Sequence, residues 1–195
     1  MGAFKPLLPF GDDTVIGACI ESLRRGGAET VIVVVGGDSR AEELRQRLSN
    51  LAVTFAVNPD PASEMSHSIA SGVQQLPAST RAALIIPADH PAVPPEVVTK
   101  LISEWQKGGK LVAPSHAGRG GHPVLVDMQF RSELTNLDPQ RGLKGLFQAH
   151  PGVVSRPEVN TSLIARDMDT WDDYRALHQE VFGVAPPDLP SSRNV

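Results

Sequence analysis

The stretch ETVIVVVGGDSRAEELRQRLSNLAVTFAVN, residues 29–58, contains two strand-like runs separated by a helix-like run. Residues 31–35 are β-branched without polar alternation, which is typical of a strand covered on both faces, as in a parallel sheet. Asp38 or Ser39 precedes a helical pattern over residues 41–48, and both residue types cap helix N-termini. Residues 53–58 form the next strand-like run, so the stretch predicts a β-α-β unit.

The same alternation continues on both sides of this unit. We expect helices over residues 14–25, 66–76, 94–109, 129–136, 143–150 and 170–182, and further strands over residues 82–89, 110–116, 122–127 and 163–167. The glycine-rich residues 117–121 predict a hairpin-like connection between two of these strands. The pattern indicates one three-layer α/β domain over residues 1–183, with a mostly parallel, mixed sheet. The Pro- and Ser-rich residues 184–195 are expected to form a flexible tail.

Composition narrows the class of protein. The net charge of −4 argues against a general affinity for nucleic acid or for an anionic membrane surface. A single cysteine, Cys19, excludes an internal disulfide framework and is compatible with a reducing cytoplasm, which we take as the expected location. No apolar run is long enough for a transmembrane helix, and no signal-peptide pattern is visible.

Acidic residues follow two predicted strands that lie far apart in the sequence. Asp89 follows the strand over 82–89, and Asp169 follows the strand over 163–167. Ligands bind at the carboxyl ends of strands in such sheets, and Mg²⁺ needs few protein carboxylates because it keeps positions for phosphate and water. The alternative is structural: Asp169 caps the last helix, and Asp89 orders the turn before Pro91.

Two further segments favour anion binding. Asn58 begins a break in the chain that is followed by Ser66 and Ser68 in the first turn of a predicted helix, where free N–H groups and hydroxyls gather. The alternative for these serines is a simple N-cap. Arg119 and His122 lie in the glycine-rich turn, where they contact an anionic substrate or belong only to a mobile loop.

Five blocks of sequence, taken in order, resemble the nucleotidyltransferases of molybdenum-cofactor maturation, in particular the cytidylyltransferase branch. They are KPLLPFG (5–11), NPDPASEMSHSI (58–69), PADHPAV (87–93), GRGGHPVLV (118–126) and DMDTWDDY (167–174). The resemblance implies a Rossmann-like nucleotidyltransferase fold and a reaction in which a phosphate of the molybdopterin cofactor attacks the α-phosphate of CTP, with Mg²⁺ as cofactor.

The resemblance also implies roles for single residues. Lys5 matches a lysine that contacts the nucleotide phosphates, and Asp89 matches the acidic residue of the metal-binding block. Asp169 matches the second metal-side position, with Asp167 as a helper. The substrate-binding positions that the resemblance implies are Asn58, Met65, Ser68, Arg119 and His122.

The N-terminus departs from the family pattern. In the family, a buried strand and a glycine-rich loop that wraps the nucleotide precede KPLLPFG, whereas Met1 and Gly2 here align with the last two residues of that loop. Either the sequence starts at an internal methionine or this is a degenerate member without transferase activity. Glu64 stands where the family favours glycine. The exposed sheet edge that such a loss would leave also predicts a homodimer.

Three functions remain open at this stage. The first is a Mg²⁺-dependent cytidylyltransferase acting on the molybdenum cofactor, with GTP as the alternative nucleotide. The second is a non-catalytic protein that binds the molybdenum cofactor and delivers it to a molybdoenzyme. The third is a nucleotidyltransferase with another phosphate acceptor, because one fold hosts many acceptors.

Overall fold

The computed structural model describes residues 4–60 and 64–187. The predicted β-α-β unit is present. Strand β3 (Val31–Val35) pairs in parallel with β4 (Val53–Val57), in a register that joins Val31 to Val53 and Val35 to Val57. Helix α2 (Ser39–Arg47) connects them, and the Asp38 side chain caps it by accepting a hydrogen bond from the Ala41 amide.

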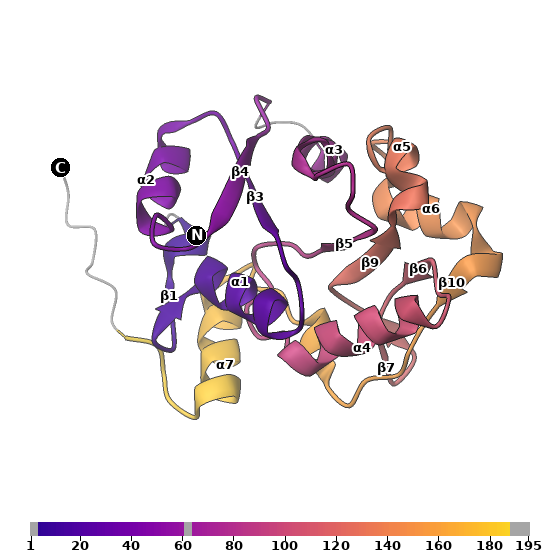
Figure 1. The fold of residues 1–195 in the computed structure, drawn as a ribbon. Coiled ribbons are helices and arrows are strands. Elements are labelled where there is room, and N and C mark those ends of the chain that lie inside the picture. The colour runs from indigo at the N-terminus through magenta and orange to yellow at the C-terminus, as the bar shows by residue number, and fades with distance from the viewer. Residues whose placement is uncertain (1–3, 61–63, 188–195) are drawn as a thin grey trace.

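A second, mixed sheet lies beside this pair (Figure 1). Its strand order is β10 (Val154–Ser155), β6 (Leu111–Val112), β9 (Val124–Asp127) and β5 (Ala82–Ile85). Strand β9 runs antiparallel to both β5 and β6, whereas β10 pairs in parallel with β6. The fold is therefore the expected α/β class with a mixed sheet.

Two small antiparallel hairpins complete the strands. One pairs β1 (Pro9–Phe10) with β2 (Asp13–Thr14), and the other pairs β7 (Ser115–His116) with β8 (Arg119–Gly120). The β7–β8 turn places Ala117 at φ +49° and Gly118 at φ +78°, the two positive values that a tight hairpin turn favours. The predicted returning connection between residues 116 and 122 is confirmed.

Helices cover the sheets and lie close to their expected positions. They are α1 (Val15–Arg25), α3 (Met65–Gln75), α4 (Pro95–Gln106), α5 (Arg131–Leu134), α6 (Gly142–Ala149) and α7 (Trp171–Phe182). Short 3-10 turns are η1 (Lys5–Leu7), η2 (Met128–Phe130), η3 (Pro151–Val153) and η4 (Ser162–Ala165). No helix within the described ranges is long and apolar enough to span a bilayer.

One sequence prediction of local structure is wrong. The strand expected over 163–167 is replaced by η4, because the Thr161 hydroxyl accepts a hydrogen bond from the Leu163 amide and closes a turn. The helix expected over 129–136 is present as η2 followed directly by the short helix α5, and the Asp127 carboxylate caps η2 by accepting from the Gln129 amide. The predicted tail lies outside the described residues from position 188 onward.

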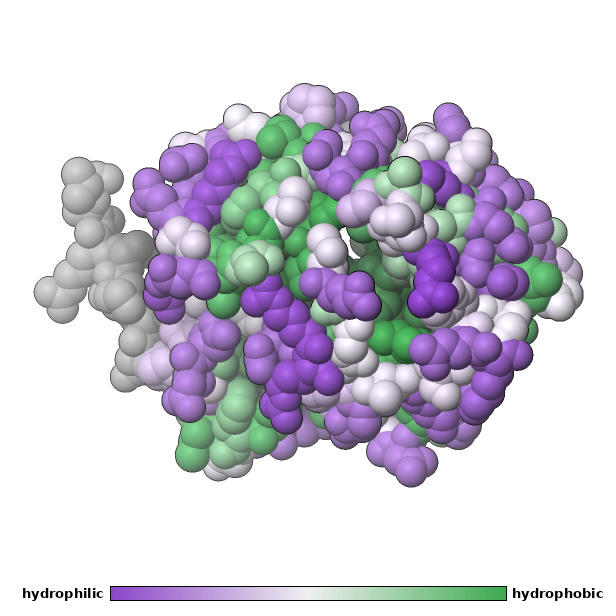
Figure 2. Space-filling model, in the orientation of Figure 1, coloured by the Kyte–Doolittle hydropathy of each residue, from purple (hydrophilic) through white to green (hydrophobic). Residues whose placement is uncertain are grey.

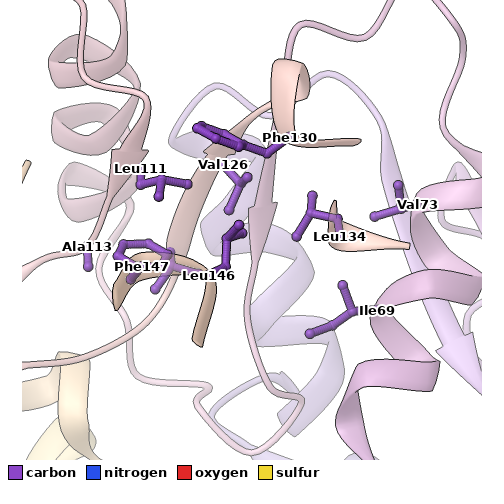
Figure 3. Close-up of a cluster of buried hydrophobic side chains, with 10 residues drawn as sticks. Ile69, Val73, Leu111, Ala113, Val126, Phe130, Leu134, Leu146 and Phe147 are labelled. Carbon is purple, nitrogen blue, oxygen red and sulfur yellow. The ribbon is translucent and has the colours of Figure 1, made fainter. Parts of the chain in front are cut away.

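The largest core cluster joins the mixed sheet to α3, α5 and α6 (Figure 3). It consists of Ile69, Val73, Leu111, Ala113, Val124, Val126, Phe130, Leu134, Leu146 and Phe147. A separate cluster packs α1 and α2 against β3. Each sheet thus has its own apolar packing.

Candidate functional site

The N-terminal segment lies against the carboxyl ends of β3 and β5. Phe4 and Pro6 line a cavity of about 200 Å³ together with Val35, Gly36 and Ala88. Arg40, at the start of α2, places its guanidinium 5.8 Å from the centre of the Phe4 ring. The two strands therefore end at the same edge, and residues 4–6 mark it.

Lys5 bridges this edge to the segment before α7. Its ammonium donates a hydrogen bond to Asp169 Oδ1 at 3.2 Å, and it also interacts electrostatically with Asp89. Asp169 is largely exposed, with 72% of its side chain accessible, whereas Lys5 retains 29%. Asp169 does not cap α7, because Thr170 is the N-cap and forms a capping box with Asp173. The Asp169 carboxylate is therefore available to charged partners.

Asp89 is held in its ionised form. The His90 ring donates from Nδ1 to Asp89 Oδ1 at 2.8 Å, and this hydrogen bond is the main reason that the pKa of Asp89 lies below its ordinary value. Burial opposes this effect, while the His90 charge and Lys5 add to it. An ionised carboxylate at this edge can coordinate a hard cation at neutral pH.

His122 comes just before β9, whose first residue Val124 pairs with the last residue of β5, and it lies next to this pair. Its ring packs edge-on against the His90 ring, with the centroids 5.0 Å apart. Burial, followed by the nearby His90, lowers the pKa of His122, so the neutral ring is favoured. Asp89, His90 and His122 therefore form one cluster, in which an ionised carboxylate lies beside two imidazole rings.

The residues after β4 form a second group. The buried Asn58 donates from Nδ2 to the Ser68 hydroxyl at 3.0 Å, which ties the end of β4 to the first turn of α3. Ser68 is thus an acceptor for Asn58, and Glu64, with no side-chain cap bond, occupies the N-cap position. Met65 at the start of α3 is 55% exposed and offers an apolar surface beside this pair.

Arg119 projects from the β7–β8 hairpin, where it is exposed. The hairpin is anchored to η4: the His122 amide donates to the Ile164 carbonyl at 2.7 Å. Gly121 permits this approach, since a Cβ atom at that position would lie 2.2 Å from the Ile164 carbonyl oxygen. The hairpin is therefore tied to η4, which comes before the segment leading to Asp169.

The donor set fits Mg²⁺ as it binds in nucleotide sites. Mg²⁺ is usually held by one or two carboxylates, with phosphates and water completing its octahedron. Asp89 and Asp169 supply two carboxylates, and the Lys5 ammonium interacts electrostatically with both of them. Residues 4–60 and 64–187 contain no cluster of three or more His, Cys, Asp or Glu side chains suited to a metal.

The structure brings some of the expected site residues together and leaves others apart. Lys5, Asp89, Asp169 and His122 belong to one connected region, and Asn58 and Ser68 form a pair. Sequence reasoning did not select His90 or Arg40. His90 stands next to Asp89 in PADHPAV, and this adjacency was the available signal for it.

Comparison with known proteins identifies the class. The model of the MobA-like NTP transferase domain matches residues 1–154, so the chain belongs to this family and is a nucleotidyltransferase. This confirms the resemblance that the five sequence blocks carry.

Particular relatives are distant in sequence but similar in fold. The nicotine blue oxidoreductase of Paenarthrobacter nicotinovorans is 24% identical over 183 residues, which cover 89% of this chain and 87% of the relative. The crystal structure of Rv0371c from Mycobacterium tuberculosis in complex with manganese is 25% identical, with a TM-score of 0.77 over 91% of this chain and 93% of that one. A nucleotidyl transferase from Methanothermobacter, 22% identical over 92% of this chain and 85% of that one, shares the fold with a TM-score of 0.77.

Proposed function

We propose that this nucleotidyltransferase transfers a cytidylyl group from CTP to a terminal phosphate of the molybdopterin cofactor, with Mg²⁺ as the metal. The observation that carries the proposal is the shared position of Lys5, Asp89 and Asp169 at the edge where β3 and β5 end. A cation flanked by two carboxylates suits a substrate that is a metal–triphosphate complex.

The chemistry needs charge neutralisation and alignment more than a protein nucleophile. An oxygen of the acceptor phosphate forms a bond to the α-phosphorus of CTP. The bond from that phosphorus to the bridging oxygen breaks, and pyrophosphate leaves with the electron pair. Lys5 would turn from Asp169 to the phosphates, and Asp89 and Asp169 would hold the Mg²⁺ that offsets the developing charge. Asp167 remains a proposed helper.

The residues proposed for the acceptor come from two segments, the β7–β8 hairpin and the end of β4 with the start of α3. Arg119 is exposed and suits a bidentate contact with the acceptor phosphate. His122 in its neutral form can donate or accept a hydrogen bond without adding charge. The Asn58–Ser68 pair and the exposed Met65 would contact the polar and apolar parts of a pterin.

The proposal is tested by measuring pyrophosphate release from CTP and from GTP, with molybdopterin cofactor and Mg²⁺, for the chain and its Asp89→Asn variant. Loss of one charge-stabilising group predicts a fall in kcat of at least about 10²-fold. Asp172→Asn is the matched control, because Asp172 is 90% exposed, contacts Arg175, and lies outside the site. Equal rates for Asp89→Asn and the unsubstituted chain would exclude Asp89 as a metal ligand.

Two other outcomes would redirect the proposal. Cofactor binding that needs neither Mg²⁺ nor nucleotide, with no pyrophosphate release, would support a protein that delivers the molybdenum cofactor to a molybdoenzyme. Pyrophosphate release with another phosphate acceptor would keep the reaction and change the substrate. The relative from Paenarthrobacter is named an oxidoreductase, so a parallel dye-reduction assay tests that class directly.

A cytoplasmic location and a homodimer complete the proposal. A single cysteine that lies buried in α1 suits a reducing compartment. Light scattering of the purified chain tests the dimer, and a mass of one chain of 20.8 kDa would exclude it.

A further inference from the structure

The segment that carries Asp89 connects β5 to α4 and is tied to helix α1 on both sides of Asp89. Before it, the Ala88 carbonyl accepts a hydrogen bond from the Cys19 thiol, with 3.9 Å between sulfur and oxygen. After it, the Val93 carbonyl accepts from the Ser22 hydroxyl at 2.5 Å. Both donors are buried in α1. The backbone around Asp89 is therefore held in place by a regular element.

The start of the same segment lines the large cavity between β3 and β5. This cavity has a volume of about 660 Å³, and its walls include Pro87 and Ala88. Figure 2 shows a hollow near the middle of this face, with hydrophobic atoms in its visible walls. Asp89 and His90 are not among the residues that line the cavity. The orientation of the Asp89 side chain therefore depends on contacts outside the cavity.

His90 supplies such a contact. Its side chain is buried, and its Nδ1 lies 2.8 Å from Asp89 Oδ1. An ionised carboxylate only accepts hydrogen bonds, so the proton in this bond belongs to Nδ1. The His122 ring packs edge-on against the His90 ring, with 5.0 Å between the ring centroids, and limits its rotation. The Asp89 carboxylate is thus bound at one oxygen by a buried ring.

We propose that His90 is a positioning residue, which occupies Oδ1 of Asp89 and leaves Oδ2 as the oxygen that coordinates the divalent cation. This inference rests on the proposed function, in which Asp89 is a metal ligand. Hydrogen bonds from neighbouring side chains fix the orientation of ligating carboxylates and are needed for full metal affinity. A carboxylate whose other oxygen is engaged binds the cation through a single oxygen.

Binding through a single oxygen also bears on which cation is favoured. Ca²⁺ accepts bidentate carboxylates in a flexible coordination sphere, whereas Mg²⁺ demands a nearly ideal octahedron completed by water and phosphate. Because His90 engages Oδ1 of Asp89, the bidentate arrangement is disfavoured. His90 therefore favours a small octahedral cation over Ca²⁺ at this site.

The test measures Mn²⁺ binding to the nucleotide-free full chain by electron paramagnetic resonance, and Ca²⁺ binding by competition with Mn²⁺. His90→Asn and His90→Gln both remove the ring and its contact with His122. The asparagine nitrogen is bonded to Cγ, as Nδ1 of histidine is, whereas the glutamine nitrogen lies one atom further along, as Nε2 does. Asparagine therefore keeps a donor beside Asp89, and glutamine displaces it.

His150→Gln is the matched control. His150 Nε2 lies 2.8 Å from Glu133 Oε2, so this variant breaks a histidine–carboxylate pair that does not belong to the candidate site. Its affinity for Mn²⁺ should equal that of the unsubstituted chain. Thermal unfolding of all variants is measured in parallel, because similar melting temperatures for His90→Asn and His90→Gln show that a difference in affinity between them does not arise from unfolding.

The proposal predicts that His90→Gln weakens Mn²⁺ binding at least about tenfold, with a smaller loss for Ca²⁺, and that His90→Asn restores most of the affinity for Mn²⁺. Equal Mn²⁺ affinities for His90→Gln and the unsubstituted chain would overturn the positioning role. Equal losses in His90→Asn and His90→Gln would also overturn it, because the ring packing would then account for the effect. An equal loss for Ca²⁺ and Mn²⁺ would overturn binding through a single oxygen.

Failure of the proposed function has a different signature in the same assay. If Asp89 is not a metal ligand, Asp89→Asn binds Mn²⁺ as tightly as the unsubstituted chain does. A loss of affinity in Asp89→Asn together with full affinity in His90→Gln would keep the metal site and overturn only the role of His90.

Discussion

Replacing Gly121 by alanine tests whether the β7–β8 hairpin and η4 form one rigid unit behind the proposed acceptor site. An added Cβ would lie 2.2 Å from the Ile164 carbonyl oxygen, 2.5 Å from its carbon and 2.7 Å from the Ile164 Cβ. These are mainly backbone atoms, so no side-chain rotation relieves the contact. The hairpin and η4 must separate by about 0.8 Å to reach the 3.0 Å limit of real Cβ contacts.

The magnitude follows from two effects. Overpacking in a well-packed region costs about 1–3 kcal/mol, and stretching the bond from the His122 amide to Ile164, 2.7 Å in the native chain, costs about 1 kcal/mol more. The sum of about 2–4 kcal/mol corresponds to a fall in melting temperature of about 4–16 °C for a domain of this size. The same displacement moves Arg119 and His122, so KM for the acceptor should rise more than KM for the nucleotide.

Gly120→Ala is the matched control. A Cβ at Gly120 meets its nearest atom, Arg156 Nη1, at 3.6 Å, which is an ordinary contact. Both substitutions reduce the entropy of the unfolded chain equally, so this contribution cancels in the comparison. Thermal unfolding followed by circular dichroism measures the difference. Equal melting temperatures for the two variants would show that the close approach of Gly121 to η4 does not constrain the structure, and would refute the reasoning.

Three further substitutions test the contacts that hold the site and the core. Tyr174→Phe removes the buried hydroxyl that donates to the Pro9 carbonyl at 2.6 Å and leaves that carbonyl without this donor. The free energy of unfolding, measured with denaturant, should fall by about 1–3 kcal/mol, and an unchanged value would contradict the buried bond. Leu134→Ala, at a fully buried position in the largest core cluster, should cost about 2–5 kcal/mol in the same assay, whereas a cost under 1 kcal/mol would mean that the site collapses without a cavity. Trp105→Phe removes the indole donor to Asp127 Oδ2 at 2.8 Å. Burial of Asp127 opposes ionisation, but hydrogen bonds from the Gln129 amide, Trp105 and Lys110 hold its pKa below the ordinary 3.8. The stability that this lowered pKa contributes is present above pH 3.8 and is lost as the pH falls through the folded-state pKa. The Trp105→Phe penalty in melting temperature should therefore be larger near neutral pH than in strong acid, and a penalty independent of pH would contradict the role of the carboxylate.

Much of the fold could be predicted because its local signals agree with its tertiary structure. The β-branched run over 31–35 is a strand, and Asp38 caps the helix that follows it. Prediction failed where a side chain competes with the regular backbone pattern. The hydroxyl of Thr161 turns residues 162–165 into a 3-10 helix, although their apolar composition favours a strand.

Only part of the candidate site could be predicted from the sequence. The predicted order of strands and helices places Asp89 after a strand. Because ligands bind at the carboxyl ends of the strands in such sheets, this position made Asp89 a candidate site residue. The bond from His90 to Asp89 joins neighbours in the sequence, whereas the ring contact between His90 and His122 depends on which side chains meet near β5 and β9, and no local pattern in the sequence encodes that contact. The pairing of Lys5 with Asp169 joins residues 164 positions apart.

The sequence by itself determined the alternation of strands and helices, the family and the segments that carry charged residues, because helix caps, periodicity and ordered sequence blocks are local. Only the tertiary structure decided how the strands are shared between two sheets, since register and neighbours depend on packing over long separations. It also decided the surroundings of the two carboxylates: a hydrogen bond from His90 lowers the pKa of Asp89, and Asp169 is exposed beside Lys5. The cavity between β3 and β5 was likewise decided by the tertiary structure, because the two strands that line it come close only in the folded chain.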